Sequence, residues 1–283
     1  MMQVFTRVQE MQEWSLQQKR LGKKIGLVPT MGYLHDGHLS LVRRAKAECD
    51  VVIVSIFVNP LQFGVGEDYE EYPRDLTRDA ALLEKEGVEA TFAPSVKEMY
   101  PQGYSTTVEV GGEITAKLCG KSRPGHFKGV TTVVSKLFNI CLPEVAYFGQ
   151  KDAQQAMIIE KMVRELNFPL RIVRGPIVRE SDGLAMSSRN VYLNEEERKS
   201  ALVLSQALGL ARELIENGET SVGKVKEAMI NLINSKPFTD IDYVEIYNGE
   251  DLSDLAEIKG KVLVALAVRV GKTRLIDNLL LEV

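Results

Sequence analysis

Residues 24–58 read KIGLVPTMGYLHDGHLSLVRRAKAECDVVIVSIFV, and this stretch decides the fold. The apolar run Lys24–Val28 indicates a short strand. Val51–Val58 is β-branched at nearly every position, which is typical of a strand buried on both faces of a parallel sheet. Between these two runs, His38–Glu48 places its apolar residues at helical spacing. A strand, a helix and a strand in this order predict a βαβ unit with a right-handed crossover.

The same alternation of strands and helices continues to about residue 178. Further helices are expected over 75–87, around 130–141 and over 153–167, and further strands over 88–93, 145–148 and 170–178. Gly87 follows the first of these helices as its stop signal. The pattern predicts an α/β domain with a doubly wound, Rossmann-like parallel sheet over residues 1–177.

The pattern changes after Val178. The polar stretch RESDGLAMSSRN is expected to form a loop before a long helix that begins at Asn194 or Glu195 and ends at Asn217. A second helix over 221–235 and strands over 243–247, 262–270 and 274–281 follow. Two helices and an antiparallel meander predict a smaller α+β domain over residues 178–283.

The composition narrows the class of protein. The 283 residues carry 35 Lys and Arg against 39 Asp and Glu, a formal charge of -4, which argues against a general nucleic-acid binder. The longest apolar run is far shorter than the roughly 20 residues that cross a membrane, and the first residues show no secretory signal. The three cysteines are widely spaced and fit free thiols in a reducing compartment. A cytoplasmic protein without nucleic-acid or membrane partners is therefore expected.

Two of the three histidines lie close together in the loop between the first strand and helix of the βαβ unit. Ligands of doubly wound sheets bind where strands end and helices begin, and the N-terminus of a helix attracts phosphate. The residues of this candidate phosphate site are Pro29, Thr30, Met31, Gly32, Tyr33, Leu34, His35, Asp36, Gly37 and His38. A single histidine there would more often be a helix cap or a surface residue. The pair of histidines with two glycines favours a ligand site.

The segment His35–His38, HDGH, resembles the HIGH signature of the nucleotidyltransferase superfamily, in which two imidazoles stabilise phosphates during adenylyl transfer. Met186, Ser187, Ser188 and Arg189 resemble the KMSKS loop that accompanies this signature. By itself the sequence MSSR would fit a solvated polar loop. Arg189 would offer a fork of donors suited to phosphate oxygens.

A narrower resemblance rests on five strings in order: VPTMGYLHDGH (28–38), FVNPLQFGVGEDYEEYPR (57–74), RPGHFKGVTTVV (123–134), YFGQKDAQQ (147–155) and LAMSSRN (184–190). Together they are similar to the pantothenate synthetase family, and the resemblance covers essentially the whole chain. It implies an ATP-dependent ligase that joins pantoate to β-alanine through a pantoyl-adenylate, with release of AMP and pyrophosphate, on the route to coenzyme A. It also implies Mg²⁺ and a homodimer formed through the larger domain.

The resemblance implies roles for particular residues. His35 and His38 would act on the transferred phosphoryl group, with His38 as a proton donor, and Lys151, Ser187 and Arg189 would share in catalysis. The other implied ATP contacts are Gly149, Gln150, Asp152, Val178, Met186 and Ser188. Gln62 and Gln155 would bind pantoate, and Gln62 also β-alanine. Asn59 follows the same buried strand as Gln62, and its amide suits the carboxylate and hydroxyls of pantoate.

Asp79 aligns with a carboxylate tied to Mg²⁺ in the family, and Mg²⁺ typically takes one or two carboxylates with phosphate oxygens. The family often has another acid just before it, whereas this chain has Arg78. A solvated helix face is the alternative for Asp79. His126 has no assigned role, and Arg123 and Lys128 beside it fit anion steering or surface ion pairs equally well.

Three alternatives to the ligase remain open from the residues. A different nucleotidyltransferase would share HDGH and MSSR but would not need Asn59, Gln62 and Gln155. A metal hydrolase that used His35 and His38 would need a third ligand, and no H-E-x-x-H helix is present. A nucleotide sensor without catalytic activity would make no AMP from ATP, pantoate and β-alanine. In the ligase, the smaller domain is expected to close over the adenylate, because water would hydrolyse it.

Overall fold

The computed structural model describes residues 2–283, which form two compact units. The first unit contains the residues up to 110 together with 123–150 and 158–176. The second unit contains 111–122, 151–157 and 177–283. The main division thus falls between residues 176 and 177, and two short segments from the first half of the chain group with its C-terminal part.

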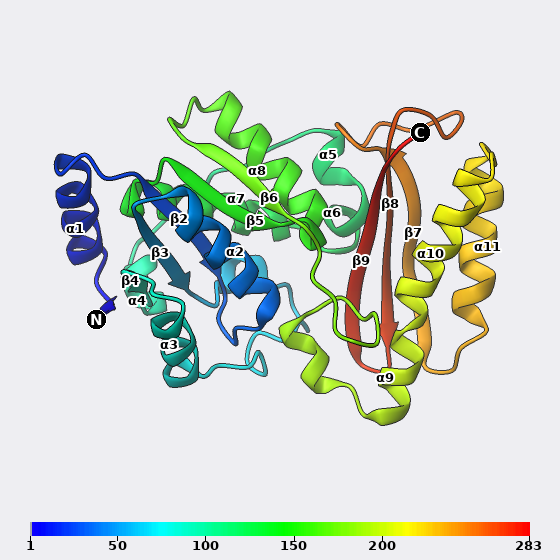
Figure 1. The fold of residues 1–283 in the computed structure, drawn as a ribbon, viewed down its shortest axis with the longest axis horizontal. Helices are drawn as coiled ribbons and strands as arrows, with labels where there is room; N and C mark the ends of the chain where they lie inside the picture. Colours follow the sequence, from blue (N-terminus) through cyan, green and yellow to red (C-terminus); the bar gives the residue numbers. More distant parts are fainter. Residues whose placement is uncertain (1) are drawn as a thin grey trace. The chain divides into compact units, whose positions relative to one another are not determined.

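A six-stranded parallel sheet organises the first unit (Figure 1). In sheet order its strands are β1 (Gln3–Phe5), β4 (Ala90–Phe92), β3 (Val51–Ile56), β2 (Ile25–Thr30), β5 (Val145–Gly149) and β6 (Arg171–Gly175). The chain proceeds from β2 through β3 to β4 on one side, and from β5 to β6 on the other. The strand order therefore reverses between β2 and β5, which is where doubly wound sheets bind ligands. The α/β prediction is confirmed.

Helices cover this sheet because its central strands are apolar on both faces. The helices of the unit are α1 (Val8–Arg20), α2 (Asp36–Glu48), α3 (Leu76–Lys85), α4 (Val96–Met99) and α7 (His126–Cys141), together with most of α8 (Ala153–Glu165). On one face, Leu39 and Val42 of α2 pack with Val28, Val54 and Tyr147, all of which are buried. Helices α1 and α7 contact each other and β2.

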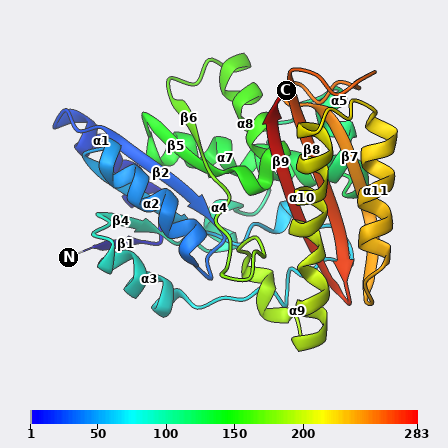
Figure 2. The same cartoon turned by 45° about the vertical axis from the view of Figure 1, so that its right-hand side comes forward.

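The second unit is built on three antiparallel strands, β7 (Thr239–Asn248), β8 (Lys261–Val270) and β9 (Thr273–Glu282). Figures 1 and 2 show α10 (Val203–Glu216) and α11 (Val222–Asn234) lying along this sheet. The short helices α5 (Glu113–Ala116), α6 (Leu118–Ser122) and α9 (Glu195–Ala201) complete the unit. Its core is separate from that of the first unit and combines buried residues of α10, α11 and the three strands.

Some predicted elements differ from the structure. The expected helix from 194 to 217 is divided at Leu202 into α9 and α10, although its end before the left-handed Gly218 is as predicted. The N-terminal strand and helix, β1 and α1, were missed. The buried residues of α1 are Met11, Ser15 and Gln18, so two of the three are polar and the helix has no clear apolar stripe.

None of the helices formed by residues 2–283 is both long enough and apolar enough to cross a bilayer.

Candidate active site

The HDGH loop leaves the sheet where the strand order reverses. Pro29 and Thr30 end β2, residues 31–35 form the loop, and residues 36–38 are the first turn of α2. Thr30 Oγ1 donates to the Ser55 carbonyl of β3 at 2.7 Å and accepts the Gly32 N–H at 3.1 Å. Gly32 has a φ of +84°, and a Cβ there would lie 2.9 Å from Ile56 Cγ2. The loop therefore depends on glycine at this position.

Asp79 of α3 holds the same loop through hydrogen bonds to its main chain. Its carboxylate is 1% exposed and accepts the Tyr33 N–H and the Leu34 N–H, both at 2.7 Å. Arg78 donates to Asp79 at 3.3 Å and to the Leu34 carbonyl at 2.8 Å. Burial raises the pKa of the Asp79 carboxyl, although these N–H groups act in the opposite direction. The alternative of a solvated helix face for Asp79 is wrong, because the side chain is buried, and Arg78 binds the loop that Asp79 holds.

His35 and His38 face each other at the start of α2, with ring centroids 4.0 Å apart. His38 Nδ1 accepts the His35 N–H at 3.4 Å. A ring nitrogen that accepts carries no hydrogen, so neutral His38 has its hydrogen on Nε2. In this tautomer Nε2 is the ring nitrogen that can donate a hydrogen bond.

Asn59 and Gln62 lie just beyond the C-terminal end of β3, Asn59 directly before the 3₁₀ turn Pro60–Gln62 and Gln62 at its end. Asn59 is 1% exposed, and its amide nitrogen donates to Gln62 Oε1 and to the Gly129 carbonyl, both at 3.1 Å. Gln62 Nε2 lies 3.3 Å from Met31 Sδ. The structure therefore brings Gln62, predicted to bind substrate, beside Met31 of the predicted ATP loop.

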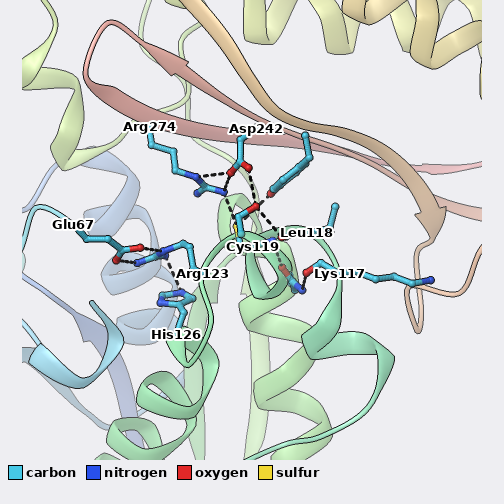
Figure 3. Close-up of polar contacts among 11 residues, drawn as sticks. Glu67, Lys117, Leu118, Cys119, Arg123, His126, Asp242 and Arg274 are labelled. Atoms are coloured by element: carbon cyan, nitrogen blue, oxygen red, sulfur yellow. Dashed lines mark hydrogen bonds and ion pairs between the residues drawn. The ribbon is translucent and has the colours of Figure 1, made fainter. Parts of the chain in front are cut away.

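Arg123 and His126 hold the main chain of Gln62 at the start of α7. The Gln62 carbonyl accepts from His126 Nδ1 at 2.8 Å and from Arg123 at 3.2 Å. Arg123 also forms a two-pronged ion pair with Glu67, with both N–O distances 2.6 Å, as Figure 3 shows. Burial would raise the pKa of Glu67, but the hydrogen bonds and charge of Arg123 outweigh it and lower the pKa to about 2. Lys128, by contrast, makes an exposed ion pair with Glu109.

The segment Gly149–Asp152 continues from β5, the strand beside β2. Leu27 pairs with Ala146, so Gly149 ends its strand level with Thr30 at the same edge of the sheet. Gln150, Lys151 and Asp152 form a 3₁₀ turn before α8, and the Lys151 carbonyl accepts from Asn278 of β9 at 2.9 Å. Gln155 is half-buried on the first turn of α8.

The predicted residues of the second unit meet around a short hairpin. The Met186 N–H donates to the Val178 carbonyl at 3.0 Å, and Arg179 and Ala185 form an antiparallel bridge. Ser187 caps the 3₁₀ helix Ser188–Tyr192 by accepting the Arg189 N–H at 3.2 Å. These contacts give the MSSR segment a defined conformation, in place of the solvated loop that the sequence left open.

No cluster of three or more His, Cys, Asp or Glu side chains that could hold a metal ion occurs within residues 2–283.

Several residues of this region were not identified from the sequence. Tyr100 donates to Asn59 Oδ1 at 2.8 Å, and Gly129 lets the turn that carries Gln62 approach α7. A Cβ on Gly129 would lie 2.2 Å from the Leu61 carbonyl oxygen. Tyr100 belongs to none of the five strings, and Gly129 lies in RPGHFKGVTTVV without being singled out there. Arg123 and His126 stood in a recognisable string, but their partners became visible only in the fold.

A family model and named relatives both show that the chain is similar to pantoate–β-alanine ligases, which are also called pantothenate synthetases. The family model described as Pantoate-beta-alanine ligase matches residues 3–280. The pantothenate synthetase of Syntrophomonas wolfei is 65% identical over 282 residues, which is 100% of each chain. The pantothenate synthetase of Carboxydothermus hydrogenoformans is 60% identical over 282 residues, again 100% of each chain.

Solved structures agree with this result. Pantothenate synthetase from Thermus thermophilus matches with a TM-score of 0.93 and 48% identity, over 98% of this chain and 99% of that one. Pantoate-beta-alanine ligase from Francisella tularensis, solved with Beta-gamma ATP and β-alanine, matches with a TM-score of 0.81 and 35% identity, over 99% of this chain and 98% of that one. The chain therefore belongs to the pantoate–β-alanine ligase family.

Proposed function

We propose that this chain joins pantoate to β-alanine at the expense of ATP. The pantoate carboxylate attacks the α-phosphorus of ATP and pyrophosphate leaves. The amine of β-alanine then attacks the acyl carbon of the pantoyl-adenylate, and AMP leaves. The observation that carries this proposal is the HDGH loop of a chain that the family model matches over residues 3–280. Hydrogen bonds to Asp79 hold the loop at the reversal of strand order, beside Gln62.

The phosphate contacts in the first unit would come mainly from side chains and from the start of α2. Asp79 occupies the N–H groups of Tyr33 and Leu34, so these cannot donate to phosphate while the loop keeps this conformation. His35 and His38 remain as the groups that stabilise charge on the transferred phosphoryl group, aided by the helix N-terminus. In the tautomer that accepts the His35 N–H, His38 Nε2–H would donate a hydrogen bond to this charge.

Gln62 and Gln155 would bind pantoate, and Gln62 would also contact β-alanine. Both side chains end in an amide, which can donate to carboxylate and hydroxyl oxygens. The second unit would supply Lys151 and Arg189 to the phosphates, with Ser187 and Ser188 beside them. Gly149, Gln150 and Asp152 would contact the nucleotide, and Val178 and Met186 its adenine. Residues 178–283 would also shield the adenylate from water.

Asp79 does not fit a direct Mg²⁺ ligand. Both of its oxygens accept main-chain N–H groups at 2.7 Å, and the carboxylate is buried. A Mg²⁺ ion that accompanies ATP would therefore take its oxygen ligands from the phosphates and from water, as Mg²⁺ commonly does.

A homodimer, a cytoplasmic location and the absence of nucleic-acid partners stay predictions from the resemblance and the composition. Light scattering on the purified protein would measure the mass of the assembly in solution.

The activity is tested by following AMP release from ATP with pantoate, with and without β-alanine. We expect pantoate-dependent exchange of pyrophosphate into ATP without β-alanine, and sustained AMP release when β-alanine is added. AMP formation that required some other carboxylic acid would contradict the substrate assignment. Exchange that did not depend on pantoate would favour a different nucleotidyltransferase.

A further inference from the structure

The side chain of Asn59 is used entirely within the protein. Its Oδ1 accepts the Tyr100 hydroxyl at 2.8 Å and the Leu61 N–H at 3.3 Å. Its two Nδ2 hydrogens are donated to the Gly129 carbonyl and to Gln62 Oε1, each at 3.1 Å. An amide has two acceptor sites and two donor hydrogens, so Asn59 has reached its full capacity. With the side chain 1% exposed, Asn59 is placed to act through Gln62 rather than on a ligand directly.

Tyr100 strengthens the orientation of the Asn59 amide that the Leu61 N–H and the Gly129 carbonyl also require. A neutral phenol can donate to the oxygen of an amide, and burial raises the pKa of Tyr100, so the hydroxyl keeps its hydrogen. The ring is held by Phe57, with centroids 6.0 Å apart, and by Tyr104, with centroids 5.0 Å apart. The Lys136 ammonium lies 5.8 Å from the Tyr100 ring centroid. The hydroxyl is therefore presented from a fixed ring.

The orientation of Asn59 in turn fixes that of Gln62. Because Asn59 Nδ2 donates to Gln62 Oε1, the oxygen of Gln62 faces Asn59 and its Nε2 faces Met31. Among the bonds within residues 2–283, the Gln62 side chain makes only these two, and the sulfur of Met31 is a weak acceptor. Gln62 thus presents N–H donors and not an oxygen to a ligand. Donors suit the carboxylate and hydroxyl oxygens of a hydroxy acid.

We propose that Tyr100 is a positioning residue for pantoate recognition: through Asn59, its hydroxyl holds the Gln62 amide with the donor side toward the substrate. The inference rests on the proposed function, because it takes Gln62 as a pantoate ligand. Without the Tyr100 hydroxyl, Asn59 Oδ1 keeps only the longer bond from Leu61, so Asn59 holds the Gln62 amide less firmly and Gln62 can turn. A turned Gln62 sets its oxygen against the substrate's oxygens.

The test compares Tyr100→Phe with Tyr104→Phe in pantoate-dependent pyrophosphate exchange. Each change removes one hydroxyl and keeps the ring, and the Tyr104 hydroxyl has no contact with Asn59 or Gln62 among the bonds of residues 2–283. We expect Tyr100→Phe to raise the KM for pantoate roughly tenfold, which corresponds to about 1.4 kcal/mol, while the KM for ATP stays within about twofold. Tyr104→Phe should leave both constants within about twofold of the wild type.

A double-mutant cycle with Gln62→Ala separates positioning from a general loss of structure. If Tyr100 acts through Gln62, adding Tyr100→Phe to Gln62→Ala leaves the KM for pantoate unchanged. The proposal is overturned if Gln62→Ala weakens pantoate use and Tyr100→Phe does not, or if the KM for pantoate and the KM for ATP rise together. A wild-type enzyme that fails to use pantoate at all would overturn the proposed function first, and this inference with it.

Discussion

Asp79 is a buried carboxylate. The family resemblance suggests that it binds a metal, whereas in the structure it binds the main chain of the HDGH loop. Its two oxygens bind successive main-chain N–H groups of Tyr33 and Leu34, and Tyr33 has a left-handed φ of 51°. Such a conformation in a residue other than glycine persists only where its surroundings hold it. Asp79 therefore maintains the conformation from which His35 and His38 project.

Replacing Asp79 with Asn tests this function. The Asn oxygen can accept one of the two N–H groups, but the amide nitrogen would oppose the other, so we expect a loss of about 1–3 kcal/mol in stability and a raised KM for ATP. Excess Mg²⁺ should not restore activity, because the defect lies in the loop. The control is Asp75→Asn, which alters only the exposed cap of α3, where Asp75 accepts the Arg78 N–H. Recovery of Asp79→Asn at high Mg²⁺ would show that Asp79 is a metal ligand after all.

Among single residues, those that carry a motif were the ones that could be predicted. His35, His38 and Gln62 stand in recognisable strings, and the fold places all three at one edge of the sheet. Tyr100 could not be found in this way, because its importance lies in one hydrogen bond across 41 residues of sequence. A tyrosine carries no information about its partner until the chain is folded.

At the scale of elements, the segment after Gln62 is fastened to the start of α7 by the Glu67–Arg123 ion pair. The two side chains are 24% and 17% exposed, so solvent screens the pair less than it screens a surface pair. Arg123 also binds the Gln62 carbonyl. A single guanidinium therefore joins the turn Pro60–Gln62 to the segment that follows it. We therefore expect the turn and the segment around Glu67 to stay fixed relative to each other.

This ion pair predicts a pH dependence of stability. The pKa of Glu67 is about 2 in the folded chain, below its ordinary value of 4.5, so the pair contributes stability above about pH 4.5 that is lost as the pH falls toward 2. We expect Glu67→Gln to cost on the order of 2 kcal/mol at neutral pH, with the difference from wild type shrinking below pH 4.5. Urea unfolding followed by the fluorescence of Trp14, the one tryptophan, reports on the first unit.

The exposed Glu109–Lys128 pair of the first unit provides the control for that experiment. Its side chains are 63% and 43% exposed, and Glu109→Gln should change stability by no more than about 0.5 kcal/mol at any pH. A difference between wild type and Glu67→Gln that stayed constant down to about pH 3 would contradict the assignment of the low pKa to this pair.

At the scale of the whole molecule, the two units have separate cores, and sequence periodicity could indicate only part of this arrangement. It predicted the parallel sheet and the meander, because their strands are apolar runs in a regular order. It could not predict that 111–122 and 151–157 group with the C-terminal unit. Polar contacts hold those segments, and no repeating sequence pattern predicts such contacts. Ser122 donates to Asp242 at 2.7 Å, and Gln154 accepts the Cys119 N–H at 3.0 Å.

Because the core of the second unit consists of other residues, we expect that a catalytic side chain outside that core can be replaced while the protein still folds. Arg189 is only partly buried and lies outside the core of α10, α11 and β7–β9. If it stabilises phosphoryl charge, Arg189→Ala should slow single-turnover adenylation by about a hundredfold or more, as the loss of one such donor does elsewhere. The thermal midpoint of Arg189→Ala should move by no more than about 2 °C, and Lys199→Ala at an exposed position of α9 should change neither quantity. Unchanged adenylation in Arg189→Ala would exclude the residue from catalysis, whereas a large fall in the midpoint would assign it to the fold.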